Sequence, residues 1–155
     1  MQTRRDMFSH STKVAVMLVA AGMLPTLAKA QAAGYNTAAF DAKTIPELMK
    51  ALGGGAPVES RDVTVSGPDI AENGAVVPVG VSTSLQGVKR LLLLVEKNPS
   101  VLSAIFDVTD AVDANFSTRV KMGQSSDVYA VAMMNDGKVL FAKKEVKVTL
   151  GGCGG

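Results

Sequence analysis

Apolar and polar residues alternate with a period of two along much of the chain, which is the pattern of half-buried β-strands. The alternation is clearest from Phe116 to Met122 and from Val146 to Leu150, where neighbouring side chains divide between an apolar and a polar face. Shorter alternations run from Val63 to Val65 and from Val77 to Val81. The segment Leu91–Val95 is instead continuously apolar, as expected of a strand that is buried on both faces.

Turn residues separate these runs. Asn73-Gly74 stands between the first two alternations, Asn98-Pro99 follows the continuous run, and Asn135-Asp136-Gly137 predicts a tight hairpin near the end. About six or seven short strands, roughly ten residues apart, favour a mainly β fold, an immunoglobulin-like antiparallel β-sandwich without the Cys–Trp–Cys core of antibody domains. An open barrel is the alternative.

One short N-terminal helix precedes the strands, over about Thr44–Leu52. Thr44 and Glu47 have the spacing of a capping box, and Gly53–Gly55 end the helix. Its apolar stripe consists of Ile45, Leu48, Met49 and Leu52. The small and polar residues 31–40 before it predict a flexible leader.

Two strands offer apolar side chains to both of their faces, although a small sandwich normally buries one face of each sheet. They are Leu91–Val95 and Ala130–Met134. Either these are central strands with incidental outer apolar residues, or another subunit covers the outer face, with Met133 and Met134 as adaptable contacts.

The N-terminal segment has the pattern of an export signal. Arg4-Arg5 precede an apolar stretch from Val14 to Leu27, which is too short to span a bilayer, and Ala28-Lys29-Ala30 resembles a cleavage site. The flanking residues predict a twin-arginine signal peptide over residues 1–30, hence a periplasmic protein. An ordinary secretory signal with two arginines is the alternative.

Cleavage after Ala30 changes the composition. It removes four of the 16 basic and one of the 14 acidic residues, which leaves 12 and 13, and it removes His10, the only histidine. No basic patch then suggests binding to nucleic acid or to a membrane. The loss of histidine excludes Ser-His and Cys-His dyads and blue-copper sites.

No metal site or cofactor is expected. One cysteine rules out C-x-x-C-H haem attachment and makes a zinc site improbable. Asp107, Asp110 and Asp113 are spaced by three, and we expect them to line a solvated loop.

The candidate functional residues are the last five of the chain, Gly-Gly-Cys-Gly-Gly. Cys153 is the only cysteine, and Gly151, Gly152, Gly154 and Gly155 flank it. Glycine loses the most conformational entropy on ordering, so residues 151–155 are expected to form a flexible arm beyond a β-sandwich domain of residues 31–150. Three residues past Leu150 reach about 10 Å.

The thiol has no neighbouring activator, because Lys143, Lys144 and Lys147 lie back on the strand and the terminal carboxylate disfavours the thiolate. Cys153 therefore suits a covalent attachment point that other proteins load and unload. The chain is predicted to be a carrier and not an enzyme.

This tail, on an exported β domain with a single cysteine, resembles the SoxY family, the sulfur carriers of the bacterial Sox thiosulfate-oxidation system. The resemblance implies that Cys153 holds thiosulfate-derived intermediates and that the four glycines form its swinging arm. It implies a heterodimer with a small β subunit of the SoxZ type. It also implies loading by a SoxAX-type haem enzyme, hydrolysis by a SoxB-type enzyme and, in some organisms, oxidation by a SoxCD-type dehydrogenase.

Three other interpretations are open. The first is an exported structural or adhesion module that is disulfide-linked through Cys153. The second is a ubiquitin-like sulfur carrier, which also ends in Gly-Gly but requires activation in the cytosol and a β-grasp fold. The third is an unstructured terminus with an accidental cysteine.

Overall fold

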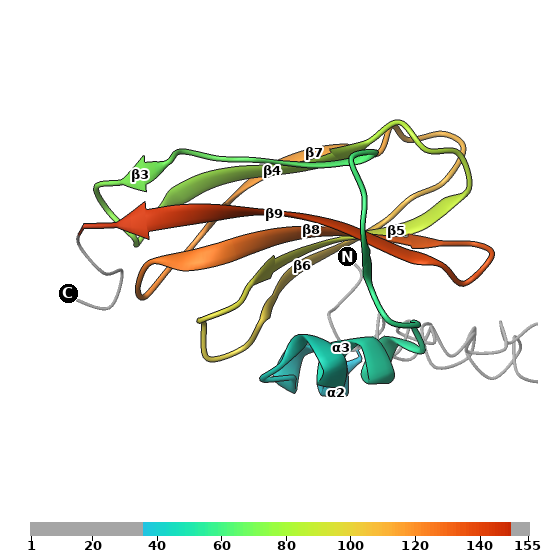
Figure 1. Ribbon diagram of the computed structural model, residues 1–155, viewed down its shortest axis with the longest axis horizontal. Coiled ribbons are helices and arrows are strands. Elements are labelled where there is room, and N and C mark those ends of the chain that lie inside the picture. The colour runs from blue at the N-terminus through green and yellow to red at the C-terminus, as the bar shows by residue number, and fades with distance from the viewer. Residues whose placement is uncertain (1–35, 150–155) are drawn as a thin grey trace, which may run out of the picture. The chain divides into compact units, whose positions relative to one another are not determined.

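The computed structural model describes residues 36–149 of the chain; the predicted signal peptide and the predicted arm lie outside the described residues. Two β-sheets are stacked, and two helices lie below the larger sheet (Figure 1). The helices are α2 (Thr37–Asp41) and α3 (Ile45–Leu52). The strands are β1 (Val58–Glu59), β2 (Val63–Ser66), β3 (Ile70–Ala71), β4 (Val77–Thr83), β5 (Val88–Val95), β6 (Leu102–Asp107), β7 (Asn115–Val120), β8 (Ser126–Met134) and β9 (Val139–Val148).

The strand order confirms the predicted β-sandwich. The larger sheet has the order β1-β9-β8-β5-β6, and β3 also pairs with β9, while the smaller sheet has the order β2-β4-β7. The long strands pair antiparallel, as the turn residues predicted, but the two-residue strands β1 and β3 pair parallel with β9. Between β1 and β3 the chain crosses to the smaller sheet as β2. It therefore meets the edge of β9 twice.

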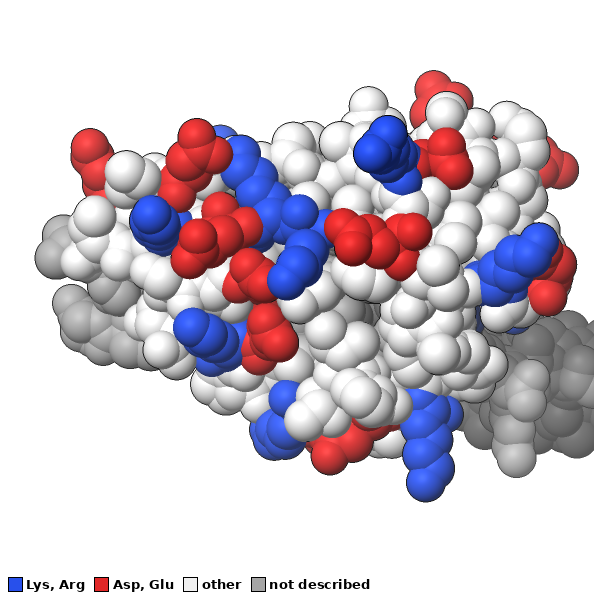
Figure 2. Space-filling model, in the orientation of Figure 1, with Lys and Arg blue, Asp and Glu red and all other residues white. Residues whose placement is uncertain are grey.

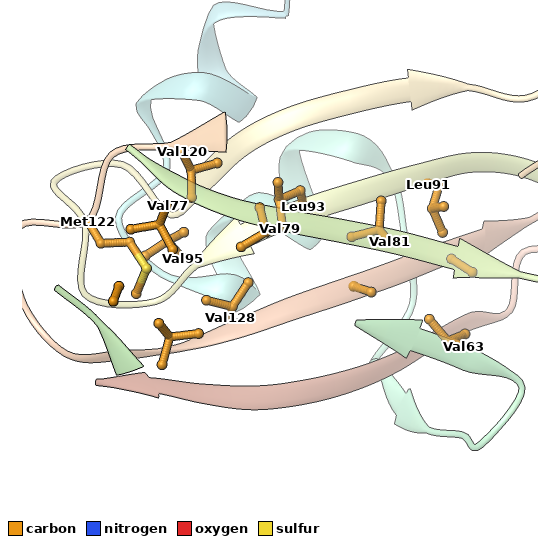
Figure 3. Close-up of a cluster of buried hydrophobic side chains, with 14 of the residues drawn as sticks. Val63, Val77, Val79, Val81, Leu91, Leu93, Val95, Val120, Met122 and Val128 are labelled. Carbon is orange, nitrogen blue, oxygen red and sulfur yellow. The ribbon is translucent and has the colours of Figure 1, made fainter. Parts of the chain in front are cut away.

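The main core lies between the two sheets. Alternate residues of the facing strands point into it, among them Val79 and Val81 of β4 and Leu91 and Leu93 of β5 (Figure 3). The phenyl rings of Phe106 and Phe116 stack at the border of this core, with ring centroids 4.3 Å apart. The alternation that the sequence shows therefore corresponds to burial between two layers.

The outer face of the larger sheet carries a second core, which the two helices cover. Leu92 and Leu94 of β5 and Val131 and Met133 of β8 point away from the first core and pack against the helices. The helices contribute chiefly Ala39, Leu48 and Met49.

The interpretation of these strands as central is confirmed, because β8 and β5 lie inside the larger sheet, but the rest of both interpretations was wrong. The outer residues are not incidental, and no second subunit is needed to bury Met133, which is 8% exposed. Met134 is half-buried and packs against the core between the sheets. The amphipathic helix was recognised in the sequence, but its pairing with this face depends on tertiary contacts.

Helix α3 confirms Thr44 as its N-cap and its end at Leu52, but only half of the predicted capping box. The Thr44 side chain accepts a hydrogen bond from the Glu47 N–H at 3.4 Å, and the carboxylate of Glu47 accepts one from the Lys43 N–H. Gly53 ends the helix with φ of 69°, a left-handed conformation that glycine adopts without strain.

The prediction of a flexible leader was wrong for residues 37–40, and residues 36–149 contain two helices where one was expected. Helix α2 begins after Asn36, whose side chain accepts a hydrogen bond from the Ala39 N–H and donates one to the Ala51 carbonyl oxygen. Five residues are too few for helix propensity to be decisive, so the burial of Ala39 and Ala42 stabilises this turn. Within residues 36–149, no helix is long and apolar enough to cross a membrane.

The helical layer can be tested with Leu48→Ala. Leu48 is fully buried against the outer face of the larger sheet, so its truncation is expected to lower the free energy of unfolding by about 2–5 kcal/mol. Lys50→Ala, on the exposed side of the same helix, is the control and should stay within about 0.5 kcal/mol of wild type. Urea denaturation measures both, and equal stability of the two variants would contradict the packing described here.

Candidate functional site

The predicted carrier residue Cys153 and its flanking glycines, Gly151, Gly152, Gly154 and Gly155, all lie outside the described residues. What the structure does describe is the point from which the tail departs. That point is the end of β9, and Thr149 is the last described residue. We call this end of β9 the root of the tail. Its position limits where the thiol of Cys153, four residues further along the chain, can be presented.

The end of β9 is hydrogen-bonded on both of its edges. On one side the N–H of Lys147 donates to the Asp69 carbonyl oxygen at 3.0 Å, and the N–H of Thr149 donates to the Ala71 carbonyl oxygen at 3.1 Å. On the other side the N–H of Val148 donates to Oγ of Ser125 at 2.9 Å. Successive N–H groups of a strand point in opposite directions, so both neighbours are needed to hold these residues.

A fourth hydrogen bond comes from a side chain. The hydroxyl of Thr149 donates to the Glu72 carbonyl oxygen at 3.0 Å. We call these four hydrogen bonds, made to Asp69, Ala71, Glu72 and Ser125, the clamp. Each contributes about 0.5–1.5 kcal/mol at most, because solvent competes for them, but together they fix the backbone up to Thr149.

The clamp residues are themselves tied to the fold. The N–H of Met122 donates to the Gly74 carbonyl oxygen at 2.7 Å, which links the loop after β3 to the loop after β7. The side-chain amide of Asn98 donates to the Lys121 carbonyl oxygen at 2.7 Å, which links the latter loop to the turn after β5. The root of the tail is therefore set in a rigid end of the sandwich.

Two of the three lysines near the root are neutralised by ion pairs. The ammonium of Lys143 contacts Asp127 at 2.8 Å, and that of Lys144 contacts Asp69 at 2.9 Å. Lys144 also donates to the Gly67 carbonyl oxygen at 2.6 Å, so it holds the segment that leads into β3. Lys147 has no ion pair within residues 36–149.

These pairs also shift ionisation. The hydrogen bond from Lys144, followed by its charge, lowers the pKa of Asp69 below the ordinary 3.8. The hydrogen bond to Asp127 is the main reason that the pKa of Lys143 is raised. Asp69 and Lys143 thus stay charged over the physiological range.

Nothing in residues 36–149 forms a recognisable catalytic or metal site. These residues include neither histidine nor cysteine, and no group of three or more Asp or Glu side chains is close enough to hold a metal ion. Asp107, Asp110 and Asp113 are all exposed, and Asp107 pairs with Arg90 at 2.7 Å.

The described surface has a hollow of about 510 Å³ beside Glu59, Arg61 and Lys143, and two others. Of these two, one, of about 440 Å³, lies on the outer face of the smaller sheet, and its floor is at Gly80 between Ser66 and Ser117. The other, of about 510 Å³, is polar and lies between the loops that include Ser84, Asp113 and Asn135. Neither contains a nucleophile paired with a base, so neither is a candidate active site.

The clamp was missed in the sequence. Strand β3 has two residues and pairs with a strand that is 77 positions away, as the bond from Thr149 to Glu72 illustrates. Neither periodicity nor turn chemistry reveals such a pairing. The inward direction of Val146 and the outward direction of Lys147 and Thr149, in contrast, agree with the predicted alternation.

Comparisons with known proteins agree with one another. A profile of the family described as "Sulfur oxidation protein SoxY" matches residues 48–153, so the match ends at Cys153. The chain is similar to the solved structure of the sulfur carrier protein SoxY from Chlorobium limicola f thiosulfatophilum, with 33% identity and a TM-score of 0.61 over 68% of this chain and 94% of that chain.

A superoxide reductase (neelaredoxin) from Ignicoccus hospitalis is similar in fold alone. Its TM-score is 0.51 at 18% identity, over 57% of this chain and 80% of that chain. The search of curated proteins found no match.

The ion pair at the clamp predicts a pH dependence. Since the pKa of Asp69 is lowered in the folded chain, the pair's contribution to holding β3 is complete above the ordinary value of 3.8 and is lost as the pH falls below it. In Lys144→Met, the Asp69 carboxyl should titrate close to its ordinary value. Side-chain carboxyl NMR measures this titration, and Lys147→Met, which leaves the pair intact, is the control. An Asp69 titration that is the same in wild type and Lys144→Met would contradict the pairing.

Proposed function

Because this chain belongs to the SoxY family of sulfur oxidation proteins, we propose that it is a periplasmic carrier that holds thiosulfate-derived oxidation intermediates on Cys153. The observation that carries the proposal is the position of the only cysteine. Cys153 lies between two pairs of glycines and is also the last residue of the family match. The chain itself is then a substrate of partner enzymes and not an enzyme.

The loading step forms one S–S bond. The thiol sulfur of Cys153 joins the outer sulfur of thiosulfate, the thiol proton is released, and two electrons pass to the SoxAX-type haem enzyme. The product is a cysteine-S-thiosulfonate. A SoxB-type hydrolase then adds water to the terminal sulfonate, which leaves as sulfate with two protons, and a persulfide stays on Cys153. A SoxCD-type dehydrogenase is the further partner that oxidises this sulfur.

The described fold supplies a fixed origin for this chemistry. The clamp holds the backbone as far as Thr149, and four residues lead from there to Cys153. At about 3.3–3.6 Å per residue these span about 13–14 Å at most. We propose that Gly151, Gly152, Gly154 and Gly155 let this segment enter a narrow active site that larger side chains would block.

The remaining parts of the chain fit the same proposal. Residues 1–30 serve as a twin-arginine signal peptide, residues 31–150 form the carrier domain, and residues 151–155 form the swinging arm. The twin-arginine route exports folded proteins, so a SoxZ-type small β subunit without its own signal can leave the cytoplasm together with this chain. The chain carries no cofactor in this scheme.

The carrier role is tested with Cys153→Ser. In a mixture reconstituted with SoxZ-, SoxAX- and SoxB-type partners, wild type is expected to gain the mass of one S₂O₃ unit on the peptide that contains Cys153 and then to release sulfate. The variant should do neither, because it has no thiol to oxidise. Intact-mass spectrometry and sulfate assay measure the two steps. If the variant loses only a covalent dimer while sulfate release continues, the chain is a disulfide-linked structural module.

The arm is tested with the double variant Gly151→Val/Gly152→Val. Two β-branched side chains restrict the backbone and thicken the segment, so enzymatic loading is expected to slow by about tenfold or more through misplacement of the thiol. Alkylation of Cys153 by iodoacetamide, which needs no protein pocket, should keep its wild-type rate. Unchanged enzymatic loading would show that the two glycines are dispensable.

A further inference from the structure

Two of the large apolar side chains that the described surface exposes lie at the clamp end of the sandwich. Ile70 of β3 is 58% exposed and Val76, in the turn that leads into β4, is 54% exposed. Ile70 directly precedes Ala71, which accepts the hydrogen bond from Thr149. Val76 donates from its own N–H to Asn73, in the loop that also provides the Glu72 carbonyl. We call Ile70 and Val76 the apolar patch.

The fold does not require apolar side chains at these two outward-facing positions. Their neighbours Ala71 and Val77 are buried in the main core, at 6% and 0% exposure. These two side chains already supply the apolar contacts that this part of the chain makes with the core. Exposed apolar side chains that lie singly need no explanation. Here, however, each lies within four residues of a carbonyl group that accepts a hydrogen bond from Thr149: Ile70 precedes Ala71, and Val76 follows Glu72 in the same loop.

The length of that segment limits where a partner can bind. Cys153 is four residues further along the chain than Thr149, so its backbone lies within about 13–14 Å of the clamp. An enzyme that takes the thiol into an internal site must therefore bring the rim of that site against the surface around Thr149. The clamp holds this surface in a fixed position relative to the start of the segment.

Charge does not single out a different docking surface. Near the root, Asp69 pairs with Lys144 and Asp127 with Lys143. Lys147 has no ion pair within residues 36–149, but the acidic Glu145 lies two positions before it in β9, and Glu72 directly follows β3, which pairs with β9 at Lys147. Figure 2 shows Lys and Arg interleaved with Asp and Glu on the face in view, without a large area of one sign. Long-range electrostatic attraction between this face and a partner is therefore weak, and contact of apolar surface is left to stabilise the complex.

From this arrangement we infer that Ile70 and Val76 form the docking patch for an enzyme that acts on Cys153, and that they bind an apolar rim at the mouth of its active site. The inference rests on the proposed function, since it requires that a partner enzyme take up the thiol. The clamp residues position the patch, and the patch in turn places the segment at the mouth of the active site.

The test uses Ile70→Thr/Val76→Thr, which keeps both side chains β-branched while it adds a hydroxyl to the patch. The matched control is Val58→Thr/Val112→Thr, because these two side chains are 61% and 45% exposed but lie in β1 and in the loop before β7, outside the clamp. Each full chain, paired with the SoxZ-type subunit, is loaded by a purified SoxAX-type haem enzyme with thiosulfate and oxidised cytochrome c.

For the patch variant we expect KM for the carrier to rise by about tenfold, with kcat, the iodoacetamide rate of Cys153 and the free energy of unfolding all unchanged. The control variant should match wild type in all four. Equal KM values for the two variants would overturn the docking patch while the proposed function stands. Absence of loading even in wild type would overturn both.

Two other occupants of the patch give distinct results. If the SoxZ-type subunit covers it, the patch variant will lose co-elution with that subunit in gel filtration, and the inference fails. If a second copy of the chain covers it, Cys153→Ser protein will dimerise with increasing concentration and the added patch substitutions will abolish the dimer. Retained pairing with the SoxZ-type subunit, a monomeric Cys153→Ser chain and a raised KM together support docking of the enzyme.

Discussion

The two-sided hydrogen bonding at the end of β9 is the constraint on which the functional geometry depends. A terminal strand with one neighbour would fray, and the origin of the segment behind it would move with the fraying. Here β3 and the loop before β8 hold the last residues from opposite sides, through Ala71 and Ser125. A carrier needs a mobile thiol on a fixed body. Thr149 is the last residue whose backbone the described structure shows to be held by hydrogen bonds.

The rest of the fold is arranged around the same strand. Strand β9 pairs along its length with β8, and the chain returns to its other edge twice, as β1 and β3, with β2 inserted between them in the opposite sheet. This crossing ties the two layers together close to the root of the tail. The two helices complete the structure by covering the outer face of β5 and β8, so that β5 is buried on both sides. A small protein without a disulfide thereby obtains two cores.

Residues 36–149 include neither histidine nor cysteine, and no group of three or more acidic side chains there is close enough to hold a metal ion. Lys143 and Lys144 are both engaged in ion pairs. Apart from Lys147, they are the cations nearest to the root along the chain. In the proposed function the surface near the root provides a stable position and, by the inference above, a place to dock, while activation of sulfur is left to the partners. A carrier that reacted by itself in an oxidising compartment would lose its cargo or acquire the wrong one.

The sequence alone determined the features that depend on neighbours along the chain. Alternating residues such as Val77, Val79 and Val81 predicted strands, and Thr44 and Gly53 bounded a helix, because local periodicity and capping chemistry are sufficient for these features. The carrier role of Cys153 between its glycines stays a prediction. Tertiary structure alone decided that α3 covers Leu92 and Leu94, that residues 37–41 are helical, and that β3 holds Thr149. Each of these depends on contacts between segments far apart in the chain, whose free energy no local pattern records.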